Sequence, residues 1–84
     1  MAKDSLRKAI AGHVIRLVRE SREKQGMSMN VLAQRSGLSQ GMVSLVEHGL
    51  RNPTLDTLLR MAEALEIDLG DVFKKAKREA MANK

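Results

Sequence analysis

The polar side chains with the most regular spacing in this chain lie between residues 29 and 49. Gln40, Ser44 and His48 recur at every fourth position, which places them on one face if the segment is helical. A glutamine amide donates and accepts hydrogen bonds at the same time, and a serine hydroxyl also does both. Such a face can recognise a partner; serine and histidine also occur in catalytic sites, but the sequence assigns them no catalytic geometry and offers no set of metal ligands. These residues therefore indicate recognition and not catalysis.

The segment that carries them predicts two short helices joined by a tight turn. The helices are expected over residues 29–36 and 40–48, and Gly37 between them is free to take the left-handed conformation. Val43 and Val46 are predicted to face inward on the second helix. This is the spacing of a helix-turn-helix, whose second helix lies in the major groove of DNA.

Apolar residues at helical spacing predict three more helices around this unit. We expect them over about residues 5–25, over residues 55–65 and from residue 69 onward. Ser5 is the expected N-cap of the first helix, and Asp68 that of the last. From Lys77 the chain either continues the last helix or frays. The sequence therefore predicts an all-α fold, a compact five-helix bundle that contains the helix-turn-helix.

The composition limits the class of protein. At 84 residues the chain predicts one domain over residues 1–84, with a core over about 6–73 and a basic tail or helix extension over 74–84. There is no cysteine, so neither a disulfide nor a thiolate metal site can stabilise the fold. A membrane-spanning apolar run and a signal peptide are both lacking. We expect a cytoplasmic protein without membrane association.

Charge is distributed unevenly along the chain. Fifteen Lys and Arg against ten Asp and Glu give a formal net charge of +5. Residues 1–24 and 74–84 each carry a net charge of +4, whereas residues 25–73 carry −3. The excess favours a polyanionic partner and lies on the end helices, not on the predicted recognition helix.

Residue types that catalyse reactions or bind metals are present but are not arranged for either task. His13 and His48 are far apart in the sequence and lack carboxylates at ligand spacing. The motifs of nucleotide-binding loops, serine hydrolases and zinc proteases do not occur. We expect no enzyme activity, no metal and no cofactor. Met27, Met29 and Met42 either fill gaps in the core or line a groove for a peptide.

One set of residues, in its order and spacing, matches a known family: Arg22, Gly26, Leu32, Ala33, Gly37, Val43, Val46, Glu47, Gly49, Pro53, Leu58, Ala64, Leu65, Asp71, Val72 and Phe73. With these residues the chain resembles the Cro/CI-type (XRE-type) helix-turn-helix family of bacterial and phage regulators, over about residues 10–73. The resemblance implies a lambda-repressor-like bundle that binds a palindromic operator as a homodimer, with a second recognition helix about one DNA turn away.

The resemblance implies base contacts on the outward face of the second helix of the unit. The matching positions are Gln40, Gly41, Ser44 and Leu45; an amide can bond an adenine edge, and a leucine can pack on a thymine methyl group. The simpler alternative is an ordinary solvated helix face. This helix has no Lys or Arg, so guanine recognition by arginine is not available. Either the affinity is modest, or it depends on the helix over residues 5–25, on the tail or on DNA shape.

Phosphate contacts are expected at helix N-termini, where free N–H groups and the helix dipole favour an anion, and after the recognition helix. The expected positions are Ser28, Met29, Ser39, His48, Arg51 and Asn52. Many relatives carry glutamine at the first position of the helix over residues 29–36, where this chain has Met29. The phosphate contact at Met29 is therefore expected from its position and not from its side chain.

Two further sets of residues are expected to hold the structure and its assembly together. Arg22 and Glu47 match a family ion pair that joins the helix over residues 5–25 to the end of the helix over residues 40–48, and we expect this pair to be structural. The fourth and fifth helices carry more apolar residues than one inward face needs. The surplus residues Leu59, Leu69 and Phe73 are either a two-fold dimer patch or a wide core stripe.

Two functions remain in competition at this point. The first is a sequence-specific DNA-binding transcriptional regulator, a repressor or autoregulator. The second is an antitoxin-like module whose main task is to bind a protein partner such as a toxin, with DNA binding secondary. The weak charge of the recognition helix and the cluster of methionines favour the second, whereas the turn and the basic ends favour the first.

Overall fold

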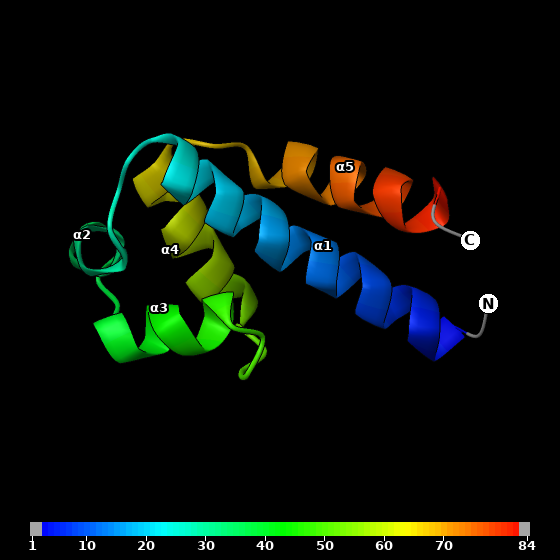
Figure 1. The fold of residues 1–84 in the computed structure, drawn as a ribbon, viewed down its shortest axis with the longest axis horizontal. Coiled ribbons are helices and arrows are strands. Elements are labelled where there is room, and N and C mark those ends of the chain that lie inside the picture. Colours follow the sequence, from blue (N-terminus) through cyan, green and yellow to red (C-terminus); the bar gives the residue numbers. More distant parts are fainter. Residues whose placement is uncertain (1–2, 83–84) are drawn as a thin grey trace.

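Five helices form the fold in a computed structural model, which describes residues 3–82 (Figure 1). They are α1 (Lys3–Lys24), α2 (Met29–Ser36), α3 (Gln40–Glu47), α4 (Leu55–Leu65) and α5 (Leu69–Ala82). Residues 3–82 contain no strand, so the prediction of an all-α five-helix fold is confirmed. None of these helices is long and apolar enough to cross a membrane.

The core consists of two neighbouring apolar clusters. One lies where α2 and α3 pack on α1 and α4, and Leu32, Val43 and Met61 in it are completely buried. The other joins α1, α4 and α5 through residues such as Val14 and Ala76. Because α1 contributes to both clusters, it connects the helix-turn-helix to the C-terminal helix.

Residues 77–82 continue α5, and the last two residues of the predicted tail lie outside the described residues. Ala76 and Ala80 lie four residues apart and are buried, and α5 runs alongside α1 in the opposite direction (Figure 1). Arg16 on α1 donates a hydrogen bond to the Glu79 carboxylate on α5, which ties the two helices together beyond their apolar contact. The small alanines allow the two helix backbones to approach, so the tail becomes part of the folded unit.

One sequence-based prediction is wrong, and burial decides two alternatives that the sequence left open. Ser5 is not an N-cap, because α1 begins at least two residues earlier and a serine inside a first turn costs it little. Leu69 is 8% exposed and belongs to the second core cluster, so it is not available to a partner. Met27 is buried and Met29 and Met42 pack against the first cluster, so these methionines fill the core and do not line an open groove.

Candidate nucleic-acid interface

The turn between α2 and α3 is built from backbone hydrogen bonds and one glycine. Gly37 takes a left-handed conformation with φ 72°, and the N–H of Leu38 donates to the Ala33 carbonyl at 3.0 Å. The hydroxyl of Ser36 is buried and donates to the Leu32 carbonyl at 2.6 Å. These bonds satisfy the end of α2 and fix the angle at which α3 leaves it.

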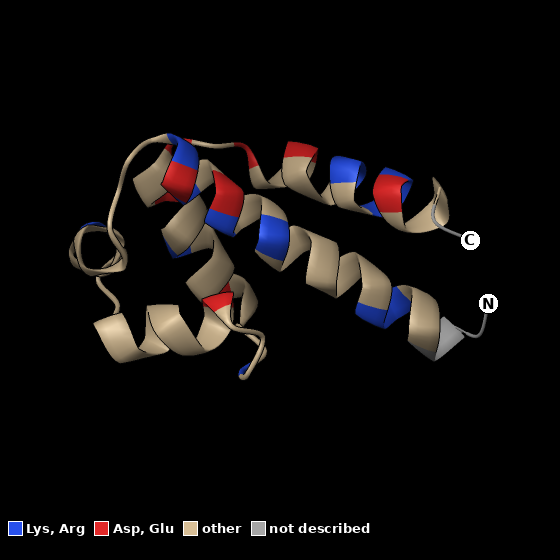
Figure 2. Cartoon of the chain, viewed as in Figure 1, with Lys and Arg blue, Asp and Glu red and all other residues tan. Residues whose placement is uncertain are grey.

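Burial of one face of α3 leaves the opposite face open. Val43 and Val46 are buried as predicted, at 0% and 1% exposure. On the other side Gln40 and Gly41 are exposed, Ser44 is half-buried and Leu45 is 38% exposed. The four expected base-contacting residues are therefore together on one accessible surface. Figure 2 shows no Lys or Arg on this helix.

The two helix N-termini of the unit are capped by the expected serines. The hydroxyl of Ser28 accepts from the N–H of Val31 at 3.1 Å, and that of Ser39 accepts from the N–H of Met42 at 3.0 Å. Both serines are exposed, as is the start of α3, whereas Met29 is half-buried. The caps leave other first-turn N–H groups for an anion, but the side chain of Met29 packs inward and offers no hydrogen bond.

His48 follows α3 with its ring held by the helix end. Its Nδ1 lies 2.7 Å from the Ser44 carbonyl oxygen, which can only accept, so Nδ1 carries the hydrogen of this bond. The Ser44 hydroxyl lies 3.3 Å from the same nitrogen. Nε2 is left on the far side of an exposed ring, where it can accept a hydrogen bond when the ring is neutral and donate one when it is protonated.

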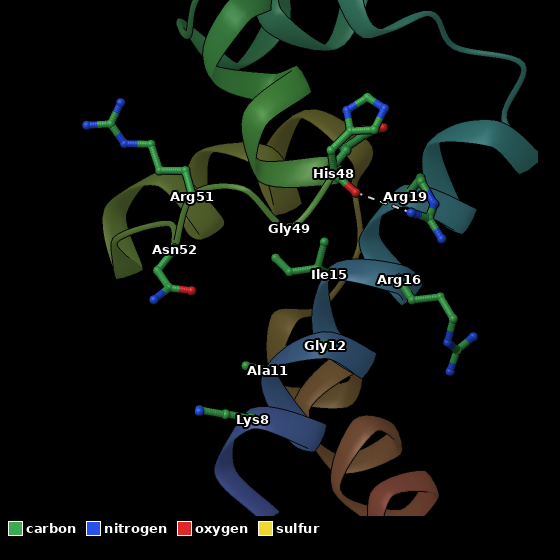
Figure 3. Close-up of a pocket in the computed structure, with 11 residues that line it drawn as sticks. Lys8, Ala11, Gly12, Ile15, Arg16, Arg19, His48, Gly49, Arg51 and Asn52 are labelled. Carbon is green, nitrogen blue, oxygen red and sulfur yellow. Dashed lines mark hydrogen bonds between the residues drawn. The ribbon is translucent and has the colours of Figure 1, made fainter. Parts of the chain in front are cut away.

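A cavity of about 350 Å³ separates the residues after α3 from the outer face of α1 (Figure 3). His48, Arg51 and Asn52, all expected phosphate contacts, line one wall. The opposite wall is α1, with the basic residues Lys8, Arg16 and Arg19. The excess of positive charge on this helix was predicted, but these three residues were not singled out; the signal was their spacing of three to eight residues along one helix.

Arg22 and Glu47 form a bidentate ion pair behind the recognition helix. The Nε and Nη2 of Arg22 donate to the two Glu47 carboxylate oxygens at 2.7 and 2.9 Å, and Nη1 donates to the Met27 carbonyl at 2.7 Å. Glu47 is 4% exposed. The hydrogen bonds from Glu47 raise the pKa of the Arg22 guanidinium above its usual value, and burial opposes this. The pair fixes the C-terminal end of α3 to α1 and to the loop before α2.

A second bond joins α1 to the same end of α3. Arg19 donates to the backbone carbonyl of Glu47 at 3.2 Å (Figure 3), where a cation also compensates the negative end of the helix dipole. Within residues 3–82 no group of three or more His, Asp or Glu side chains converges as a metal site would. The arrangement is a rigid helix with an exposed polar face and a cationic cavity at its end.

Residues 18–72 match the family model described as "Helix-turn-helix". The chain belongs to this XRE-type helix-turn-helix family. The matched residues run from α1 to the start of α5 and include the whole α2–α3 unit. Proteins of this family are DNA-binding transcriptional regulators, and the family is not a class of enzymes.

Individual members of the helix-turn-helix family are similar over the same part of the chain. An uncharacterised HTH-type transcriptional regulator of Mycobacterium tuberculosis is 41% identical over 59 residues, which is 70% of this chain and 42% of that protein. The HTH-type transcriptional regulator SlrR of Bacillus subtilis is 36% identical over 69% of this chain and 39% of its own length. The chain thus spans less than half the length of these two relatives.

Other comparisons extend over most of both proteins. An HTH-type transcriptional regulator of Sinorhizobium fredii, y4dJ, is 39% identical over 74% of this chain and 75% of its own length. In fold, the crystal structure of a point variant of the restriction–modification controller protein C.Esp1396I matches 89% of this chain and 97% of its own chain, with a TM-score of 0.79 and 24% identity. The helix-turn-helix bundle therefore occurs elsewhere with nearly the same outline.

Proposed function

We propose that this chain is a sequence-specific transcriptional regulator, a repressor or autoregulator that binds a palindromic operator as a homodimer with α3 in the major groove. The observation that carries the proposal is the face of α3 opposite its buried valines, which presents Gln40, Gly41, Ser44 and Leu45 to the solvent. A regulator that occupies an operator acts by excluding other proteins from it, and this requires no catalytic group.

Base recognition in this proposal depends on few side chains. The amide of Gln40 stands at the N-terminal end of α3, where it can form two hydrogen bonds with an adenine edge. Ser44 shares its hydroxyl with the ring of His48, and Leu45 offers an apolar surface to a thymine methyl group. Gly41 lets the helix approach the groove closely.

Backbone contacts would surround these residues. Ser28 and Ser39 mark two helix N-termini, and Met29 contributes its position through backbone N–H groups alone. Arg51 and Asn52 are exposed after α3, next to His48. Such contacts fix the register of the protein on DNA and carry no sequence information.

Dimerisation is supported by apolar side chains that the fold leaves exposed. Leu59 is 46% exposed and Phe73 39% exposed, and both were expected at a dimer interface. Leu50 and Leu55 are also large and apolar, and they are 76% and 63% exposed. They were not among the residues expected at a dimer interface. Leu55 and Leu59 are four residues apart and share one face of α4, which suits a self-complementary patch.

The exposed apolar residues also support the second candidate function. A protein partner such as a toxin would cover Leu50, Leu55 and Leu59 equally well, because exposed apolar patches mark protein interfaces in general. The methionines no longer favour this alternative, since they are in the core. Purification as a stable complex with one fixed partner, without operator binding, would favour it over the first.

Replacement of Gln40 by alanine tests the role of α3. Because the side chain is exposed, Gln40→Ala should leave the melting temperature unchanged and should weaken binding to the operator by about 1–3 kcal/mol. Non-specific binding should not change. Fluorescence anisotropy with operator and scrambled duplexes measures both, and unaltered operator affinity would show that Gln40 does not contact bases.

A further inference from the structure

The cavity between α1 and the loop after α3 has walls of different composition (Figure 3). In this view Lys8, Arg51 and Asn52 extend toward the same side, whereas Arg16 points to the other. The acidic residue of the lining is Glu47, and its carboxylate is buried and paired with Arg22. The accessible part of the cavity is therefore cationic.

The cationic side chains around this cavity differ in the ion pairs and hydrogen bonds that they already form within the protein. Arg16 pairs with Glu20 at 2.8 Å and with Glu79, and Arg19 donates to the Glu47 carbonyl. Lys8 and Arg51 are exposed, and neither forms an ion pair or hydrogen bond with the side chains that the structure describes. Both line the cavity, so an anion that enters it meets two cations without a partner among these side chains.

Gly12 forms part of the cavity wall in the middle of α1. A glycine inside a helix is less favourable than alanine, and a Cβ atom built on Gly12 would meet nothing within 4 Å. No neighbour within residues 3–82 therefore requires glycine at this position. The missing side chain leaves the surface of α1 open to a group that enters the cavity from outside.

We propose that the sugar–phosphate backbone of the bound duplex enters this cavity, where Lys8 and Arg51 bind its phosphates and Gly12 lies against the strand. This inference rests on the proposed function and extends the DNA contact from the α2–α3 unit to the N-terminal half of α1. It also places positive charge near α3, which has no Lys or Arg of its own.

Position favours a nucleic-acid backbone over an acidic protein segment. His48, Gly49 and Arg51, which line the cavity, continue directly from the C-terminal end of α3. A DNA strand that contacts α3 and then these residues would continue toward α1. Seven of the eleven residues that line the cavity are also polar or charged, whereas an amphipathic protein helix requires a continuous apolar groove.

Replacement of Lys8 by glutamine tests the phosphate contact. Each lost contact lowers the slope of log K against log salt by about 0.9, so the loss of affinity between 50 and 200 mM salt should be about 3.5-fold smaller for Lys8→Gln than for the wild type. Lys77→Gln removes the same charge from α5, outside the cavity, and should keep the wild-type slope. Equal slopes for the two variants would overturn the proposal.

Replacement of Gly12 by alanine gives a test with two readouts of opposite sign. Gly12→Ala should raise the melting temperature by about 3–8 °C, because alanine favours the helix and its methyl group meets nothing. The same change should weaken binding to operator and scrambled duplexes alike, and Gly12→Leu should weaken it further. A stabilised protein with unchanged DNA affinity would refute the role of Gly12.

Failure of this inference can be told apart from failure of the proposed function. If the wild type prefers its operator and Lys8→Gln and Gly12→Ala bind as it does, the DNA does not reach α1 although the regulator assignment holds. If the wild type shows no sequence preference, the proposed function fails, and the two variants on scrambled duplex still test the cavity. Binding of inorganic phosphate alone with wild-type DNA behaviour in both variants would also contradict the proposal.

Discussion

Replacement of Glu47 by alanine is the perturbation whose effect can be worked out most fully from the structure. The carboxylate is 4% exposed and accepts two hydrogen bonds from Arg22, whose side chain is 12% exposed. Removal of Glu47 leaves a guanidinium in a largely dry site with one remaining bond, to the Met27 carbonyl. The cost arises from this stranded charge more than from the lost attraction.

The size of the destabilisation depends on the interactions that Arg22 keeps when Glu47 is removed. Loss of one partner of a buried pair costs about 3–5 kcal/mol, and the Met27 bond and partial exposure place this case near about 3 kcal/mol. A chain of 84 residues has a total stability of roughly 4–13 kcal/mol. We therefore expect Glu47→Ala to lower the melting temperature by roughly 12–24 °C.

Circular dichroism during urea and thermal unfolding is the appropriate assay, because the chain has neither Trp nor Tyr to report by fluorescence. Glu63→Ala is a matched control, since Glu63 is an exposed glutamate on α4 and its removal should change stability by less than about 0.5 kcal/mol. The double variant Arg22→Met, Glu47→Ala should regain part of the loss because no charge is stranded.

A loss below about 1 kcal/mol for Glu47→Ala would refute this reasoning. It would mean that the guanidinium finds water or another acceptor at no cost, and that the pair does not fix the end of α3. A double variant no more stable than Glu47→Ala would likewise show that the stranded charge is not the source of the effect.

Three more changes have expected outcomes. Arg51→Ala should weaken binding to every duplex and lower the salt slope by about 0.9, and a loss confined to one sequence, measured by anisotropy, would contradict a phosphate contact. Glu66, the C-cap of α4, has φ 56°, so Glu66→Gly should stabilise the fold by about 0.5–1 kcal/mol in urea unfolding; a lower stability would show that its conformation carries no strain. Leu59→Asp should convert a dimer to a monomer in sedimentation without loss of helix, since Leu59 is 46% exposed; an unchanged sedimentation coefficient would remove it from the interface.

The helices and the turn could be predicted because their signals are local. Gly26, Gly37 and Gly49 all take positive φ, and Ser28 and Ser39 cap the helices that follow them. Each of these features depends on residues within one or two turns, so the order of residue types suffices to find it. Helix existence and type were therefore correct throughout.

Apart from the Ser5 cap, what the sequence left undecided depends on tertiary packing. Leu69 and Phe73 have the same spacing and hydrophobicity as any surplus apolar pair, and only the position of α1 determines that the first is buried and the second 39% exposed. Likewise α5 continues to Ala82 because Ala76 and Ala80 meet α1, a partner distant in sequence. The α1 wall of the cavity was not predicted for the same reason, because it meets the residues after α3 only in the folded chain.

The measurement that tests the central claim most directly is a titration of the purified protein with its own upstream DNA and with a scrambled duplex at two salt concentrations. The proposed regulator should prefer its own upstream DNA by roughly 4 kcal/mol or more, about a thousandfold, and the preference should persist at the higher salt. Equal affinity for both duplexes, falling together as salt rises, would contradict sequence-specific recognition by α3 and leave only phosphate binding.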